Sequence, residues 1–100
     1  MATAIRLDLN NPEFQELFFS LEKPQQLAVL KTFQKLRQMT WEQVYTDSGS
    51  NWEAILSKTG PGGGRLYSFR IGKGFRGVAY LDDAWLRVLG VYPDHDSAYR

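Results

Sequence analysis

The chain lacks cysteine, has a single histidine, and contains no apolar run close to the ~20 residues of a membrane-spanning helix. Without cysteine there is no disulfide bond and no thiolate chemistry, and one histidine leaves too few ligands for a typical zinc site. Residues 1–9 also lack the basic and then apolar pattern of a secretory signal. These absences predict a cytoplasmic protein that does not enter a membrane and holds no metal.

Strong charge of one sign is absent too, because the formal net charge at pH 7 is only +1. Since nucleic-acid affinity comes mainly from clustered lysine and arginine, this net charge argues only weakly for a nucleic-acid partner. The positive charge is concentrated locally instead. Residues 65–76 contain four basic residues and no acidic one, namely Arg65, Arg70, Lys73 and Arg76. This cluster predicts a positive field over one part of the fold.

The N-terminal part of the chain predicts one strand and two helices. Apolar and polar side chains alternate over residues 4–9, which is typical of a half-buried strand. Asn11 and Pro12 suit the N-cap and the first turn of a helix, and apolar residues then recur with helical spacing. Pro24 interrupts this pattern and starts a second helix over residues 24–39. So short a break predicts a helical hairpin.

Three antiparallel strands are predicted in residues 65–92, separated by a Gly-Lys-Gly turn and an Asp-Asp turn. The strand at residues 85–92 is the most apolar, so it is expected at the centre of the sheet. Residues 39–59 show no regular pattern, and their apolar side chains are expected to cover a sheet edge or a helix end. Residues 60–64 are glycine-rich and predict a flexible connector.

Together these elements predict an α+β fold. Residues 1–100 are expected to form one domain with an N-terminal strand, a helical hairpin and an antiparallel three- to four-stranded sheet. The helical hairpin would cover one face of the sheet. The opposite face would then be open and would carry some of the arginines.

The histidine, His95, directly follows the last predicted strand and is flanked by Asp94 and Asp96. Its unperturbed pKa of ~6.5 suits a general acid or base, and functional residues commonly occupy loops that follow strands. The flanking aspartates could orient the ring or raise its pKa. Tyr99, four residues later, could stack on a base or donate a proton. The simpler interpretations are a surface histidine in a polar turn and a tyrosine that only packs.

Arg76 opens a central strand of the predicted sheet, where it shares a face with Val78 and Tyr80, and Arg70 lies on the neighbouring strand. Their guanidinium groups could each bind a phosphate with two hydrogen bonds. The alternative is a sheet face kept soluble by arginine, or an ion pair to Asp82 or Glu53. Three further basic residues are weaker candidates for substrate binding: Arg65, Lys73 and Arg87. Glu53 is a candidate base in a segment whose structure the pattern does not predict.

These residue types together fit the cleavage of RNA by its own 2′-hydroxyl group. In that reaction a base removes the 2′ proton, cations stabilise the charge that grows on the phosphate, and an acid protonates the leaving 5′ oxygen. The reaction requires no metal and no cofactor, so neither is expected here.

The order of elements, the FRIGKGFRGVAY hairpin at residues 69–80 and the VYPDHDSAY segment at residues 91–99 resemble the RelE/ParE toxin superfamily. The resemblance implies a small cytoplasmic toxin that a cognate antitoxin neutralises by wrapping around it. RelE-type members enter the ribosomal A site and cut mRNA. ParE-type members share the fold but poison DNA gyrase.

The resemblance also implies roles for individual residues. Arg76 matches the arginine that opens the central strand and contacts the scissile phosphate, and Arg70 resembles a basic residue of the preceding strand. His95 falls where family members place an acid or a phosphate ligand, and Tyr99 matches a near-terminal tyrosine. Glu53 corresponds to the carboxylate base of some members.

The sequence leaves three functions open. The first is a toxin that cleaves mRNA on the ribosome and so inhibits translation, with an antitoxin as its protein partner. The second is a toxin or binding module of the same fold that acts on a protein target such as DNA gyrase and does not cleave RNA. The third is a plain RNA-binding domain in which Tyr67, Phe69 and Tyr80 stack on bases.

Overall fold

The computed structural model describes residues 4–93 of the chain. Residues 1–3 and 94–100 lie outside this range, and so do His95 and Tyr99. The helices and strands follow in the order β1 (Arg6–Asp8), α1 (Pro12–Phe19), α2 (Lys23–Arg37), α3 (Trp41–Thr46), β2 (Glu53–Thr59), the short 3-10 turn η1 (Pro61–Gly63), β3 (Arg65–Gly72), β4 (Phe75–Asp82) and β5 (Trp85–Tyr92).

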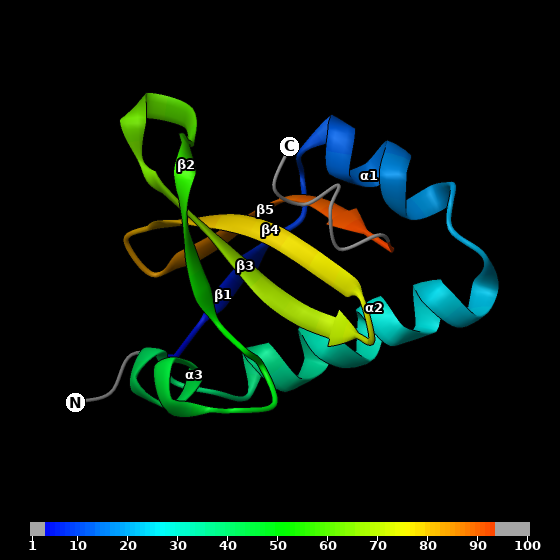
Figure 1. The fold of residues 1–100 in the computed structure, drawn as a ribbon, viewed down its shortest axis with the longest axis horizontal. Coiled ribbons are helices and arrows are strands. Elements are labelled where there is room, and N and C mark those ends of the chain that lie inside the picture. The colour runs from blue at the N-terminus through cyan, green and yellow to red at the C-terminus, as the bar shows by residue number, and fades with distance from the viewer. Residues whose placement is uncertain (1–3, 94–100) are drawn as a thin grey trace.

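The strands form one sheet in the order β1-β5-β4-β3-β2 (Figure 1). β1 is parallel to β5, and every other neighbouring pair is antiparallel. The predicted α+β class is therefore confirmed, with five strands where the sequence predicted three to four. The strand at the centre is β4 and not β5, because β1 adds to the outer edge of β5 while β2 adds to the outer edge of β3.

The first helix begins where the sequence predicts and for the predicted reason, and the second begins one residue before the predicted Pro24. The side-chain oxygen of Asn11 accepts a hydrogen bond of 3.0 Å from the backbone N–H of Phe14, which caps α1. α2 starts with a capping box in which Glu22 and Gln25 each bind the backbone N–H of the other. Within residues 4–93, no helix has the length and apolar character needed to span a membrane.

The segment predicted to be irregular contains α3 and β2, so this prediction is wrong. Thr40 and Gln43 form a second capping box, with hydrogen bonds of 2.9 and 3.3 Å, and this begins α3. β2 becomes a strand by pairing with β3, and its local sequence alone does not reveal this. The glycine-rich segment predicted as a flexible connector is the turn that joins β2 to β3. Gly62 and Gly63 have positive φ in this turn, a conformation that favours glycine.

The two faces of the sheet bury different side chains. On the face toward the helices, Phe69 and Ala79 of the sheet pack with Phe33 of α2 in the main core. The opposite face, called here the open face, has a smaller apolar cluster of Ile55, Leu66 and Val78. The open face carries arginines, as the sequence predicts. However, it also buries Arg76 and Ser68, which are 3% and 0% exposed.

Candidate active site

Arg70 and Arg76 lie directly opposite each other across β3 and β4. Directly opposed residues of an antiparallel pair have their Cβ atoms about 4.5–5.5 Å apart, and two like charges at this spacing destabilise a sheet. None of the ion pairs between described residues involves either arginine. The structure therefore brings the two predicted phosphate ligands together and leaves a position between them where an anion would be stabilised.

The guanidinium group of Arg76 is held in one orientation by polar groups of the protein. Its Nη2 donates hydrogen bonds of 2.8 Å to Ser68 Oγ and to the backbone oxygen of Asn51. With the Asn51 amide turned so that both of its ends are satisfied, the amide oxygen accepts from Nη1 at 3.1 Å. Nε is buried, and within the described part of the chain it has no hydrogen-bond partner. Because burying a charge is costly without such bonds, this network keeps Arg76 in place.

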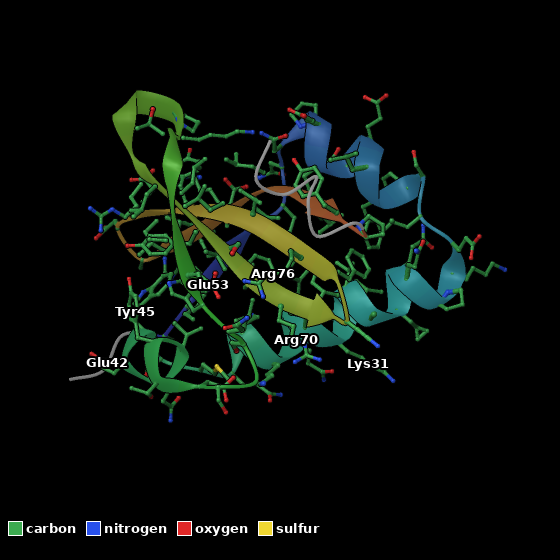
Figure 2. All side chains as sticks on the ribbon, viewed as in Figure 1. Lys31, Glu42, Tyr45, Glu53, Arg70 and Arg76 are labelled. Atoms are coloured by element: carbon green, nitrogen blue, oxygen red, sulfur yellow. The ribbon has the colours of Figure 1, made fainter. Side chains whose placement is uncertain are left out.

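Glu53 joins the same network. It is the first residue of β2, where it lies opposite Ser68. The Asn51 amide nitrogen donates to Glu53 Oε1 at 3.2 Å in the orientation that also satisfies Arg76. Asn51 thus links the candidate base to the buried arginine. Figure 2 shows Glu53, Arg76 and Arg70 following one another across the sheet.

A hollow of about 270 Å³ lies beside these residues at the β3–β4 turn. Lys73 lines it together with Arg70 and Arg76, so a third predicted basic residue is also part of the site. Gly74 has a φ of 69°, which this tight turn needs and which residues with side chains rarely adopt. We call this space the arginine hollow. Three cations around one small space favour the binding of an anion such as a phosphate.

Tyr92 is a candidate that the sequence analysis missed. It lies opposite Arg76 in the β4–β5 pair. Its side chain crosses over Gly90, where an added Cβ would lie only 2.4 Å from the Tyr92 hydroxyl. Burial raises the pKa of Tyr92 above its usual 10, and the nearby negative charge of Glu13 raises it further. Tyr92 is therefore a neutral phenol at physiological pH and is able to donate a proton.

A local irregularity in the strands explains why pattern reasoning missed Tyr92. Counting back from the Asp82–Trp85 pair at the turn would place Val91 opposite Arg76. The β4–β5 register shifts by one residue between Val78 and Ala79, and this shift brings Tyr92 there instead. No residue pattern in the sequence indicates the shift.

Two other predicted substrate ligands lie away from the arginine hollow. Arg87 sits opposite Tyr80, further along the open face, and binds Asp82 at 2.8 Å as well as Asp8. These bonds, first to Asp82 and then to Asp8, raise the pKa of Arg87. Arg65 lies at the start of β3, near Tyr45. Burial raises the pKa of Tyr45, and the positive charge of Arg65 partly opposes this rise. His95 and Tyr99 fall outside the described residues, so their predicted roles stay predictions.

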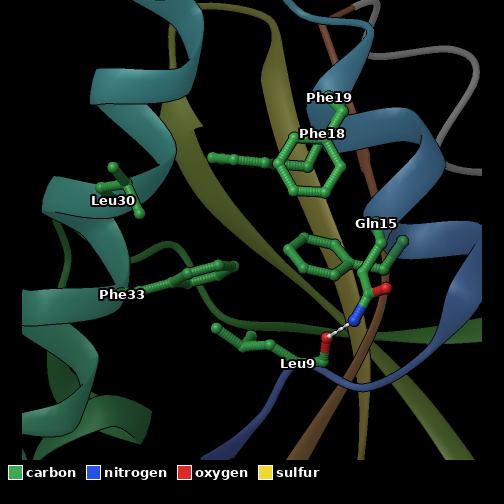
Figure 3. A pocket seen from close by; sticks show the side chains of 7 residues that line it. Leu9, Gln15, Phe18, Phe19, Leu30 and Phe33 are labelled. Carbon is green, nitrogen blue, oxygen red and sulfur yellow. Dashed lines mark hydrogen bonds between the residues drawn. The ribbon is translucent and has the colours of Figure 1, made fainter.

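A second surface feature is an apolar groove between α1 and α2 (Figure 3). Leu30 and Phe33 of α2 point toward Phe18 of α1, and the groove encloses about 310 Å³. Phe19 and Leu30 remain 73% and 54% exposed. An apolar patch of this kind suits the side chains of a protein partner more than it suits RNA.

Comparisons with known proteins agree with this geometry at the level of the fold. Two solved structures are similar over nearly the whole chain. One is the archaeal RelE-RelB complex from Pyrococcus horikoshii OT3, with a TM-score of 0.59 and 19% identity over 93% of this chain and 96% of that chain. The other is a copper-bound L66S mutant toxin from Helicobacter pylori, with a TM-score of 0.53 and 17% identity over 95% and 97%.

The sequence comparisons find no relatives. No protein-family model matches the chain, and no curated protein does. The likeness is thus carried by the backbone and by the order of the elements, and it agrees with the resemblance in the sequence. This chain shares its fold with the RelE-RelB complex structure and with the Helicobacter toxin.

Proposed function

We propose that this chain is the toxin of a type II toxin–antitoxin pair and that it cleaves mRNA on the ribosome. The observation that carries the proposal is the pair of opposed arginines, one of them buried and fixed and linked through Asn51 to the carboxylate of Glu53. The shared fold with a RelE protein, which was solved in complex with RelB, supports the toxin assignment and an antitoxin partner.

In this proposal the arginines stabilise the transition state. Negative charge grows on the phosphate oxygens as the 2′-hydroxyl attacks, and fixed cations oriented at that charge lower the barrier. Arg76 supplies a guanidinium that is already held by Ser68 and Asn51, so little reorganisation is needed when the phosphate arrives. Arg70 is exposed and completes the clamp from the neighbouring strand. Lys73 adds positive charge at the rim of the arginine hollow.

Proton transfer is assigned to the groups around this clamp. Glu53, held beside Arg76 through Asn51, is the base that takes the 2′ proton. His95 keeps its proposed role as acid or base, with Tyr99 in support, on the strength of the sequence alone. Tyr92 at the end of β5 is a second donor for the leaving oxygen. A histidine loses its proton at a lower pH than a tyrosine. A rate that falls as the histidine loses its proton therefore identifies His95 as the acid, while a rate that holds to high pH identifies Tyr92.

A second candidate function is a toxin that acts on a protein target such as DNA gyrase and does not cleave RNA. The apolar groove between α1 and α2 favours it, since Phe19 and Leu30 are exposed there. In this case the groove would decide toxicity and the arginine hollow would not.

The test is a cell-free translation reaction with added protein, in which the 5′ ends of the mRNA are mapped. We expect new ends that require translating ribosomes and that are lost with Arg70→Gln, an exposed substitution that leaves the core intact. Leu30→Glu, which alters the groove, should leave cleavage in place. Intact mRNA, together with toxicity that depends on Leu30 and not on Arg70, would overturn the nuclease and favour the protein target.

A further inference from the structure

A second hollow adjoins the arginine hollow on the side of α2. It encloses about 310 Å³, and Lys31 and Lys35 of α2 line it together with Gly49, Ser50 and Arg70. Arg70 lines both hollows, so they are adjacent. Figure 2 shows Lys31 beyond Arg70 on the side away from Arg76. We call this space the lysine hollow.

The two lysines of this hollow carry different effective charge. They lie one helical turn apart on α2 and so face the same way. Lys35 Nζ pairs with Asp47 Oδ2 at 2.9 Å and lies over Gly49, where an added Cβ would come within 2.9 Å of it. The Ser50 hydroxyl and then Lys35 lower the pKa of Asp47 to about 2, so this partner stays ionised. The charge of Lys35 is thus largely compensated, whereas no ion pair between described residues involves Lys31.

The hydroxyl groups at the hollow are already used as donors within the protein. Ser50 Oγ donates to Asp47, and Thr32 Oγ1 donates to the backbone oxygen of Ala28 at 3.0 Å. The donors left for a ligand are cationic, chiefly Lys31 and Arg70. Such a site recognises charge and not the pattern of a base edge, and this is how proteins contact a phosphate backbone.

We propose that Lys31, together with Arg70, binds the RNA phosphate next to the one held between Arg70 and Arg76. The lysine hollow is then a second backbone subsite that positions the strand for cleavage. This inference rests on the proposed function for the identity of the polymer. A polyanion fits better than a single phosphate, because the shared Arg70 makes the two hollows one continuous path.

The test measures the binding of a short single-stranded RNA, made uncleavable by 2′-deoxy substitution, by fluorescence anisotropy at several salt concentrations. Lys31→Gln should lower the affinity and reduce the slope of log K against log salt by about 0.7, the value for one lost contact to a single-strand phosphate. Lys23→Gln is the matched control, since it removes the same charge from the exposed start of the same helix. It should behave as the wild type.

The same binding measurement with a shorter ligand gives a second test. A dinucleotide with one phosphate fills only the arginine hollow, so Lys31→Gln should not change its binding, whereas Arg70→Gln should weaken the binding of both ligands. Equal effects of Lys31→Gln and Lys23→Gln on the longer RNA would overturn the subsite. So would a wild-type protein that does not bind the RNA at all.

Two further outcomes separate this inference from the proposed function. If mRNA is cleaved but Lys31→Gln behaves as the control, the subsite is wrong and the nuclease stands. If Lys31 shows the predicted effects but no mRNA is cleaved, the subsite stands as an RNA-binding feature and the nuclease is wrong. A polyglutamate peptide of similar charge serves as a third ligand. Lys31-dependent binding of this peptide, tighter than that of RNA, would overturn the subsite in favour of an acidic protein partner.

Discussion

The open face of the sheet carries arginines at both of its ends, and the two ends differ in whether these arginines form ion pairs. At one end Arg87 binds Asp8 and Asp82, so its charge is compensated within the protein. At the other end Arg70 and Arg76 oppose each other, and no ion pair between described residues involves them. The first arrangement is complete without a ligand, whereas the second is stabilised by an added anion.

The comparison separates two uses of the same side chain. An arginine with two carboxylate partners ties strands together, here β5 to β1 and to the β4–β5 turn. Arg76 is 3% exposed and donates instead to neutral oxygens, and no ion pair between described residues compensates its charge. Loss of the arginine charge should therefore weaken mainly the fold at the Arg87 end, and mainly ligand binding at the Arg70–Arg76 end.

The largest expected effect is on catalysis at the Arg70–Arg76 end. Arg76→Gln should lower the rate of mRNA cleavage by about 100- to 1000-fold, the usual loss when one charge-stabilising donor is removed from an active site. Arg87→Gln should lower the melting temperature and change the rate far less. Cleavage rates in the translation reaction, with folding checked by circular dichroism, measure both. Equal losses of activity in Arg76→Gln and Arg87→Gln would contradict the division between a catalytic end and a stabilising end.

A smaller effect, on stability, is expected when the hydrogen bond between Ser68 and Arg76 is removed. Ser68→Ala removes the Oγ that accepts from Arg76 Nη2 at 2.8 Å, and it should lower the free energy of unfolding by about 1–3 kcal/mol. Denaturant unfolding measures this loss. Ser48→Ala, at an exposed serine, is the control and should stay within about 0.5 kcal/mol of the wild type. A Ser68→Ala variant as stable as this control would show that the buried bond does not hold the guanidinium.

The smallest effect concerns pH at the Arg87 end. The backbone N–H of Asn10 and then Arg87 hold the pKa of Asp8 below its usual 3.8. A group whose pKa is lowered by folding stabilises the protein fully at a pH above its pKa in the unfolded chain. This contribution is lost as the pH falls through the lower pKa of the folded state. Asp8→Asn should therefore melt at a lower temperature than the wild type at neutral pH, and the difference should vanish in acid. Thermal melts across this range test it. A difference that persists at a pH well below the lowered pKa of Asp8, where the carboxyl is protonated in the folded protein as well, would exclude the ionised carboxylate as the cause.

Much of the fold could be predicted from local patterns. The Asn11 cap, the alternation in β1 and the turns of the β3–β4–β5 meander all depend on neighbouring residues, and the structure has them where the patterns place them. The patterns also placed Arg70 and Arg76 on neighbouring strands. These features need only the geometry of a single helix or strand.

The alignment of the site residues could not be predicted, because two register shifts produce it. One shift between Arg70 and Gly72 places Arg70 opposite Arg76, and another between Val78 and Ala79 places Tyr92 opposite Arg76. Bulges of this kind re-aim side chains near functional sites, and they depend on pairing across strands. β2 was missed for the same reason, and with it the neighbourhood of Glu53.

The most direct test of the proposed mechanism is whether cleavage requires the 2′-hydroxyl beside the scissile bond. Once the cleavage position is mapped, an mRNA is prepared with a single 2′-deoxynucleotide on the 5′ side of that bond and translated with the wild-type protein. Cleavage at this position should be lost, because the attacking hydroxyl is gone, while other sites are still cut. Continued cleavage at the substituted position would contradict an attack by the 2′-hydroxyl and the roles given to Glu53, Arg70 and Arg76.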